Sequence, residues 1–219
     1  MFAVVFEVQP KPECRDMYLE LAKHLKPLLE RIAGFVDNER FASQRTEGRV
    51  LSLSTWRDEK ALVRWRTHGE HHHVQEQGRF QVFADYHLRV GEIASDTRER
   101  AISGNRADAT EAGRAKVLTI TELTPADGDA QRISAASLDG TLGLASSTAG
   151  LVDHETFASI YTPGKLLLLA SWTDERAARA FTPRADAAAK DFRHRRITVI
   201  RDYGMRDRRE APQYYAAVE

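Results

Sequence analysis

The sequence has one cysteine, no net charge and no long apolar run, and each absence excludes a class of protein. A single Cys14 cannot form a disulfide within the chain, and so little cysteine fits a reducing compartment. No segment approaches the ~20 apolar residues of a membrane-spanning helix. Residues 1–8 lack the basic start and cleavage site of a signal peptide. We therefore expect a cytoplasmic protein.

The charge balance argues against two kinds of partner. The 32 Lys and Arg residues equal the 32 Asp and Glu residues in number, so no basic surplus attracts nucleic acid or an anionic membrane. Hydrophobic residues make up 42% of the chain, which is enough for a real core. With 219 residues, the chain can form one large domain or two small ones.

Strand and helix patterns alternate through the first part of the chain. β-Branched and aromatic runs indicate strands, and apolar residues at steps of three and four indicate helices. The expected elements are strands at 2–8, 35–44, 49–56 and 80–93, and helices at 13–32 and 58–77. This order, βαββαβ, is the ferredoxin-like unit.

The pattern then repeats. Residues 34–61 align without a gap with residues 150–177, at an offset of 116, and 15 of the 28 positions are identical. Chance alone would give one or two identities. Shorter matches flank this block: Glu7-Val8-Gln9-Pro10 with Glu122-Leu123-Thr124-Pro125, and Asp85-Tyr86 with Asp202-Tyr203. The chain is therefore two copies of one unit.

We expect an α+β fold in which two tandem ferredoxin-like (βαββαβ) domains form a pseudo-dimeric α/β barrel. The predicted boundaries are a first domain at 1–95 carrying the site, a linker at 96–114, a degenerate second domain at 115–205 and a tail at 206–219. The linker, rich in charged and small residues, should be exposed. Each unit leaves one sheet face bare, and two such faces turned toward each other bury it and enclose a space for a ligand.

Histidines gather at the end of the second predicted helix. On a helical wheel centred on Trp65, Ala61 and Leu62 form an apolar stripe, which His72 continues at its centre and His68 at its edge. His71 and His73 point progressively away. The stripe indicates either a pocket lined by imidazoles or a solvated helix end, and the sequence leaves both open.

Several motifs together resemble the antibiotic biosynthesis monooxygenase (ABM) family. They are Phe41-Ala42-Ser43, the run from Gly48 to Glu59, Trp65-Arg66-x-His68-x-Glu70-His71, Gln75, Gly78-Arg79 and Asp85-Tyr86. The resemblance implies dimeric α/β barrels of ferredoxin-like units. It also implies enzymes that oxidise polyphenolic anthrones or quinols with O2, without metal or flavin, beside relatives that bind or degrade haem.

Such a reaction requires a base that works near neutral pH, aromatic walls and a donor for the developing oxyanion. We assign His72 or His68 as the base, Trp65 as a substrate wall, and Arg66 or Gln75 as the donor. Three other residues are read differently. Trp56 recurs as Trp172 and is expected in the core, and His87 and Arg89 lie on a polar strand face where solvated surface is favoured over a cavity.

Metal and haem are both disfavoured. His68 and His72 have the i, i+4 spacing of helical zinc ligands, but no second cluster of ligands accompanies them. In the haem-degrading branch that the resemblance includes, an asparagine on the first strand and a histidine ten residues after the helix tryptophan carry function. The first strand here has no asparagine, and that later position is Gln75. Haem ligation by the nearby histidines stays open.

The second copy lacks this chemistry, because the four clustered histidines align with Arg184 and Ala187–Ala189. We therefore expect any polar cavity in the first half. The overall expectation is a cofactor-independent monooxygenase that oxidises a small aromatic or quinol-like compound with O2. The alternative is a non-catalytic module that binds a small molecule or haem. The expected partners are this small molecule, no nucleic acid and no membrane, with an intrachain pseudo-dimer and room for a further homodimer.

Overall fold

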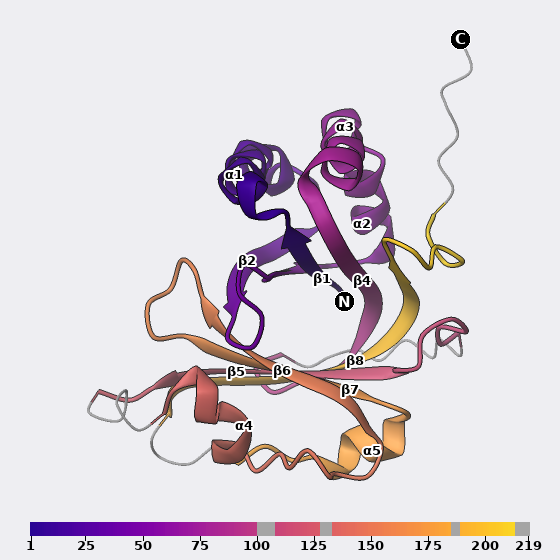
Figure 1. Cartoon of the computed structure of the whole chain (residues 1–219). Coiled ribbons are helices and arrows are strands. Elements are labelled where there is room, and N and C mark those ends of the chain that lie inside the picture. Colours follow the sequence, from indigo (N-terminus) through magenta and orange to yellow (C-terminus); the bar gives the residue numbers. More distant parts are fainter. Residues whose placement is uncertain (100–107, 128–132, 185–188, 213–219) are drawn as a thin grey trace.

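A computed structural model describes residues 1–99, 108–127, 133–184 and 189–212. Its elements follow the predicted order in the first half and a shortened version of it in the second (Figure 1). The first half contains β1 (Phe2–Pro10), η1 (Pro12–Cys14), α1 (Arg15–Glu30), β2 (Phe35–Ser43), β3 (Val50–Trp56), α2 (Glu59–Arg66), α3 (Gly69–Gln77), η2 (Gly78–Val82) and β4 (Phe83–Asp96). The second contains β5 (Val117–Pro125), η3 (Ala135–Ser137), α4 (Leu138–Thr141), β6 (Leu151–Ser159), β7 (Leu166–Trp172), α5 (Glu175–Ala180) and β8 (Ala189–Gly204).

The strands form one closed antiparallel barrel in the order β1-β3-β2-β6-β7-β5-β8-β4. Within each half, four strands have the ferredoxin-like arrangement. The halves are joined through hydrogen bonds at both edges, by β2 with β6 and by β4 with β8. The two sheets therefore turn their bare faces toward each other and also share their edges, which leaves no strand edge unpaired. The predicted pseudo-dimeric α/β barrel is confirmed.

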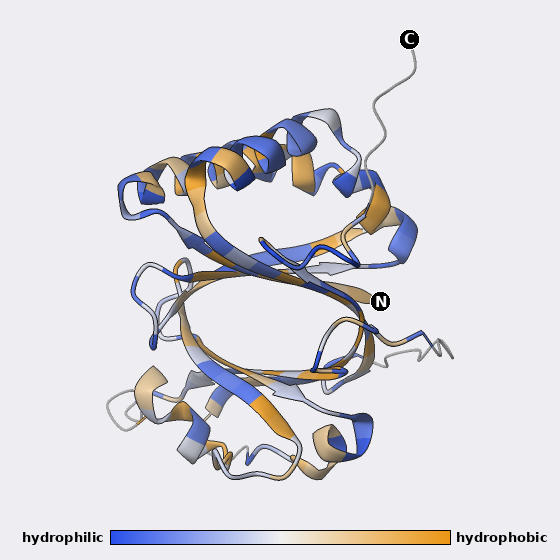
Figure 2. Cartoon of the chain, turned by 45° about the vertical axis from the view of Figure 1, so that its right-hand side comes forward, coloured by the Kyte–Doolittle hydropathy of each residue, from blue (hydrophilic) through white to orange (hydrophobic). Residues whose placement is uncertain are grey.

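Helices cover the outside of the barrel on two opposite sides (Figures 1 and 2). Alternation along β1 shows how the residues divide, since successive side chains of a strand point to opposite faces. Ala3 and Val5 belong to the apolar cluster inside the barrel, whereas Phe2 and Val4 pack outward beneath the helices. Within the described residues, no helix is both long and apolar enough to cross a membrane.

The repeated residues perform the same structural task in both halves. Gly34 and Gly150 directly precede the equivalent strands β2 and β6. Their φ values of +95° and +78° belong to a conformation that favours glycine. Trp56 and Trp172 are both fully buried, which confirms a packing role. Asp58 caps α2 by accepting a hydrogen bond from the Ala61 amide at 2.8 Å, as Asp174 caps α5 in the second half.

The prediction that the linker is exposed holds for most of its described residues, such as Asp108, Ala109 and Arg114, but not for all of them. Thr110 and Gly113 belong to the predicted exposed linker, yet both are buried at the barrel wall, where the Thr110 amide bonds the Val199 carbonyl at 2.8 Å. Residues 100–107 lie outside the described part.

The match of Asp85-Tyr86 with Asp202-Tyr203 is wrong. Strand pairing places Asp85 opposite Gln9 and Asp191 opposite Thr124, so Asp191 is the true counterpart of Asp85.

Candidate functional site

The predicted histidine helix is broken in the middle. α2 ends at Arg66, Thr67 and His68 leave the helical conformation, and α3 begins at Gly69. His68 is extended with φ −65° and ψ 127°, and its carbonyl accepts the first bond of α3, from the His72 amide at 2.9 Å. A helical wheel centred on Trp65 therefore does not continue through the break, and the histidines after it face new directions.

His71, not His72, is the imidazole that meets Trp65. Its ring stacks on the indole with centroids 4.1 Å apart and planes 15° from parallel. Its Nδ1 is 2.9 Å from the carbonyl oxygen of Trp65, which places the ring proton on that nitrogen. Burial disfavours the charged ring and lowers the pKa of His71 to about 4. The expectation that His71 points away from the apolar stripe, toward solvent or an inter-domain surface, is wrong.

The assigned residues are spread around this pair. Trp65 is 9% exposed and packs in the cluster of Phe2, Leu25 and Trp56, between α1, α2 and the outer barrel face. His68 lies with its ring 6.0 Å from Trp65, and its buried Nδ1 has no hydrogen-bond partner among the described residues. His72 places its Nε2 3.6 Å from Glu76.

The two assigned donors differ in exposure. Arg66 is half-buried. Burial raises the pKa of the Tyr203 phenol to about 12, and the positive charge of Arg66 acts in the opposite direction. Gln75 is exposed, as is His73. The structure thus brings Trp65 and His68 together with His71, and leaves Gln75 apart from them at the surface.

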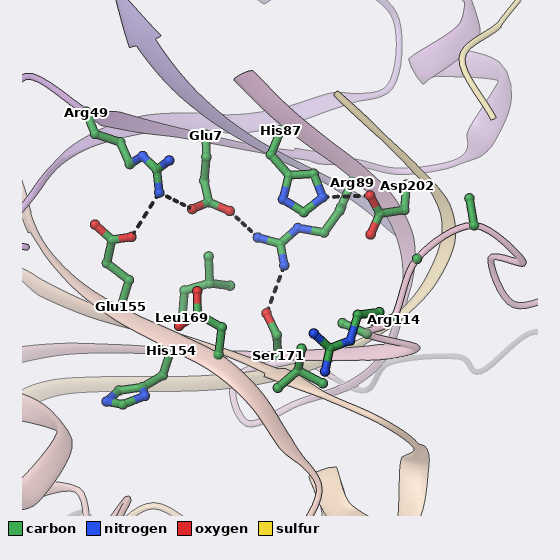
Figure 3. A pocket seen from close by; sticks show the side chains of 15 residues that line it. Glu7, Arg49, His87, Arg89, Arg114, His154, Glu155, Leu169, Ser171 and Asp202 are labelled. Carbon is green, nitrogen blue, oxygen red and sulfur yellow. Dashed lines mark hydrogen bonds and ion pairs between the residues drawn. The ribbon is translucent and has the colours of Figure 1, made fainter. Parts of the chain in front are cut away.

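A polar cavity of about 330 Å³ lies inside the barrel, on the opposite face of the sheet (Figure 3). Both halves line it, which overturns the expectation that a polar cavity belongs to the first half alone. The lining includes Glu7, Arg49, His87, Arg89, Arg114, His154, Glu155, Ser171 and Asp202. His87 and Arg89, for which solvated surface was favoured, therefore face this cavity.

Buried ion pairs with two-fold pseudo-symmetry run through the barrel. Arg89 binds Glu7 of its own half and donates to Ser171 of the other at 2.9 Å. In the same way, Arg195 binds Glu122 of its own half and donates to Thr55 across the barrel at 3.1 Å. Each arginine therefore links the two halves while neutralising a buried carboxylate, a link that sequence reasoning missed.

A second pair of equivalent cations also contacts carboxylates of both halves. Arg49 lies 3.8 Å from Glu7 and 3.4 Å from Glu155 of the other half. Its counterpart Lys165 lies 2.7 Å from Glu122 and also binds Glu39 across the barrel. Burial alone would raise the pKa of Glu122, but the positive charges of Arg195 and Lys165 outweigh burial and lower it. The available signal was the recurrence of Glu7, Glu39 and Arg49 as charged residues in the second copy.

The pseudo-symmetry fails at one pair of positions. His87 and Arg193 are counterparts, because they lie opposite Glu7 and Glu122 in the strand registers. His87 Nε2 donates to Asp202 at 2.6 Å, whereas Arg193 reaches Asp96 with three hydrogen bonds of 2.7–3.2 Å and is buried. The shorter side chain is the one that lines the cavity.

Glu210 fixes the wall of the cavity at Asp202. Its carboxylate accepts hydrogen bonds from the Thr110 hydroxyl and from the amides of Glu111, Ala112 and Asp202, at 2.6–3.0 Å. Gly113 packs so closely that a Cβ there would lie 2.5 Å from Asp202 Oδ2. The segment before β5 is thereby held against the carboxylate that binds His87.

Among the described residues, no group of three or more His, Cys, Asp or Glu side chains is placed to hold a metal ion.

Comparison with known proteins gives the family. The model of the family described as antibiotic biosynthesis monooxygenase matches residues 1–77. A jasmonate monooxygenase ABM of Pyricularia oryzae is 41% identical, and the match covers 98% of each chain. The uncharacterized protein YqjZ of Bacillus subtilis is 30% identical over 49% of this chain and 89% of its own.

Solved structures are similar at lower identity. An anthrone oxidase-like protein is 13% identical with a TM-score of 0.38, covering 97% of this chain and 96% of that one. A structure described as an antibiotic biosynthesis monooxygenase is 19% identical with a TM-score of 0.38, covering 41% and 95%. The whole-length match to the Pyricularia enzyme confirms the resemblance found in the motifs. The chain belongs to the antibiotic biosynthesis monooxygenase family and is a monooxygenase.

Proposed function

We propose that this monooxygenase oxidises a small organic compound with O2, without a bound metal, flavin or haem. The substrate classes are flat aromatic or quinol-like compounds and jasmonate. The observation that carries the proposal is the 41% identity, over the whole chain, to an enzyme named for jasmonate oxidation. The aromatic class rests on the resemblance of the motifs around Trp65 to a family that includes anthrone- and quinol-oxidising enzymes.

The proposed site is the outer face of the first half, at Trp65. The indole is the flat surface for the substrate, and the stacked His71 fixes its orientation. His71 itself is a poor base, because its pKa of about 4 and its bond to the Trp65 carbonyl leave little basicity at that ring. Its neutral ring, stacked on the indole, holds the Trp65 side chain in position.

The proposed base is His68 or His72, with His68 favoured. His68 adjoins Trp65 and is half-buried, so a substrate held at Trp65 can contact its ring and transfer a proton to it. The imidazole of His72 lies 3.6 Å from the Glu76 carboxylate, which competes for it. Arg66 is the favoured donor to the developing oxyanion because it is half-buried, and exposed Gln75 is the second candidate.

Electron counting separates the two substrate classes. Converting an anthrone methylene to a carbonyl releases four electrons, which reduce O2 so that one oxygen enters the product and the other leaves as water. Hydroxylating an unactivated C–H bond releases only two electrons from the substrate, so the other two must come from a reductant. An anthrone therefore needs O2 alone, whereas jasmonate hydroxylation needs an added electron donor.

The test is O2 uptake by metal-free protein with an anthrone, a quinol and jasmonate, each with and without ascorbate. Turnover on the anthrone or quinol without ascorbate supports the aromatic assignment, and turnover on jasmonate that requires ascorbate supports the other. A Soret band after haem titration together with no uptake on any substrate would favour a haem-binding role. Uptake that appears only after adding flavin or metal would contradict the proposal.

A further inference from the structure

The cavity inside the barrel is not used by the proposed oxidation. Trp65 and His68 lie under the helices on the outer face, whereas the cavity of about 330 Å³ lies on the inner face of the same sheet. Its volume falls at the lower end of the range for small-molecule sites. The side chains that line it are charged, and their hydrogen-bonding requirements indicate what it can hold.

Every carboxylate that lines the cavity has a partner. Glu7 binds Arg49 and Arg89, Glu155 binds Arg45 and Arg49, Asp153 binds Arg45, and Asp202 binds His87. The acceptors are therefore satisfied by the chain itself. A ligand that offers only donors, such as an ammonium or guanidinium ion, finds no carboxylate in the lining without a partner.

The unmet groups are donors. Arg89 is 4% exposed, and its Nε is buried without a hydrogen-bond partner in the described part of the chain. Arg114 is exposed where it lines the cavity, and no ion pair or hydrogen bond joins its guanidinium to another described residue. Figure 3 shows the guanidinium groups of Arg89 and Arg114 facing the same space, from β4 and from the segment before β5. These donors favour a ligand with acceptor oxygens.

The equivalent region of the second half, around Arg193, differs from the cavity. There the buried guanidinium of Arg193 lies against Asp96, 3.7 Å from Asp37, whereas His87 is shorter and reaches only Asp202. At this pair of positions, the second half places a buried guanidinium where the first half has a shorter imidazole that lines the cavity. The cavity continues outward through a second space of about 440 Å³, which shares His87, Asp202 and Arg49 with the first.

We propose that the interior cavity binds a small organic carboxylate, whose oxygens accept hydrogen bonds from the guanidinium of Arg114, beside the buried positive charge of Arg89. The bidentate geometry of guanidinium groups suits a carboxylate. Ser171 and Leu169 line the wall next to these arginines and contact the rest of the ligand. This second site is independent of the oxidation at Trp65.

Three probes of one shape and different charge test the proposal. Binding of benzoate, benzamide and benzamidinium to the full chain is measured at pH 7 by titration calorimetry and saturation-transfer NMR. Benzoate should bind at least tenfold more tightly than either of the others. Because Arg114 supplies a charge-assisted contact, Arg114→Gln should weaken benzoate binding at least tenfold, whereas Arg31→Gln, a matched change at an exposed position just after α1, should leave it unchanged.

His87→Arg introduces the residue found at the equivalent position of the second half, Arg193, and should abolish benzoate binding by filling the cavity. Benzamidinium binding as tightly as benzoate would overturn the proposal. So would an absence of benzoate binding, or binding that Arg114→Gln does not weaken. If His87→Arg fails to fold in a thermal melt, the Arg114→Gln and Arg31→Gln pair decides alone.

Discussion

The imidazole of His71 lies parallel to the indole of Trp65, with ring centroids 4.1 Å apart and the imidazole Nδ1 bound to the tryptophan's own carbonyl oxygen. This contact joins the two helices across their break at Thr67 and His68. It fixes the aromatic wall of the proposed site with a ring that must stay neutral to remain buried.

The first prediction is a loss of stability in acid that depends on His71. Its pKa is about 4 in the folded chain against an ordinary 6.5, so the unfolded chain binds the extra proton as the pH falls. The stabilisation is complete above pH 6.5 and is lost between there and pH 4, by up to about 3 kcal/mol. Urea unfolding from pH 7.5 to 4 measures this, and His71→Phe, which keeps a ring but cannot be protonated, should show a smaller decline. An equal loss of unfolding free energy in the wild type and in His71→Phe would contradict the role given to the buried His71 imidazole.

The second prediction concerns the base. His68→Ala should lower kcat by about 10²–10⁴, because the proton acceptor is lost while the buried Trp65 and His71 pair remains. His73→Ala, at an exposed position of α3, is the matched control and should keep full turnover. Steady-state rates and thermal melts of both variants provide the measurement. If His72→Ala removes turnover and His68→Ala does not, the base is His72.

The third prediction tests the ion pairs inside the barrel. Arg195→Met leaves Glu122 buried with one cation fewer and should cost about 3–5 kcal/mol of unfolding free energy. The double variant Arg195→Met, Glu122→Met removes the carboxylate as well and should recover a large part of that loss. Denaturant midpoints of both variants are compared with the wild type. A double variant less stable than the single one would show that burying the charges stabilises the barrel in its own right.

The fourth prediction concerns the clamp formed by Glu210. Burial alone would raise its pKa, but its hydrogen bonds to Thr110, Ala112 and Asp202 outweigh burial and lower it. Glu210→Gln retains a single acceptor oxygen and should cost about 1–3 kcal/mol. Limited proteolysis should cut faster within residues 108–114, whereas Glu111→Gln, at an exposed neighbour, should leave the rate unchanged. An unaltered cutting rate in Glu210→Gln would contradict the clamp.

The elements and the repeat could be predicted because hydrophobic periodicity and the pairs Gly34/Gly150 and Trp56/Trp172 depend on local backbone and packing. The break at Thr67 and His68 could not, since neither residue prevents a helix and tertiary packing decided the outcome. The counterpart of Asp85 was assigned wrongly for a related reason. A two-residue match says nothing about register, which strand pairing sets.

The interior charges were the larger omission. Glu7 and Arg89 lie on strands where charged residues usually face solvent, and only closure of the barrel turns that face inward. The sequence shows the recurrence of Glu7 as Glu122, but that of Arg89 as Arg195 becomes visible only through the strand registers, which place Arg89 opposite Val5 and Arg195 opposite Ile120. Spacing along the sequence differs between the two copies there, so a fixed offset misses the pair.

The central claim, O2 chemistry without a cofactor, is tested most directly by isotope labelling. Metal-free, flavin-free protein is incubated under 18O2 with whichever substrate the uptake panel identifies, and the product is analysed by mass spectrometry. The proposed function predicts a product that carries one 18O atom, formed at the same rate after chelation of trace metal. A product whose new oxygen comes from water, or a rate that vanishes on chelation, would contradict it.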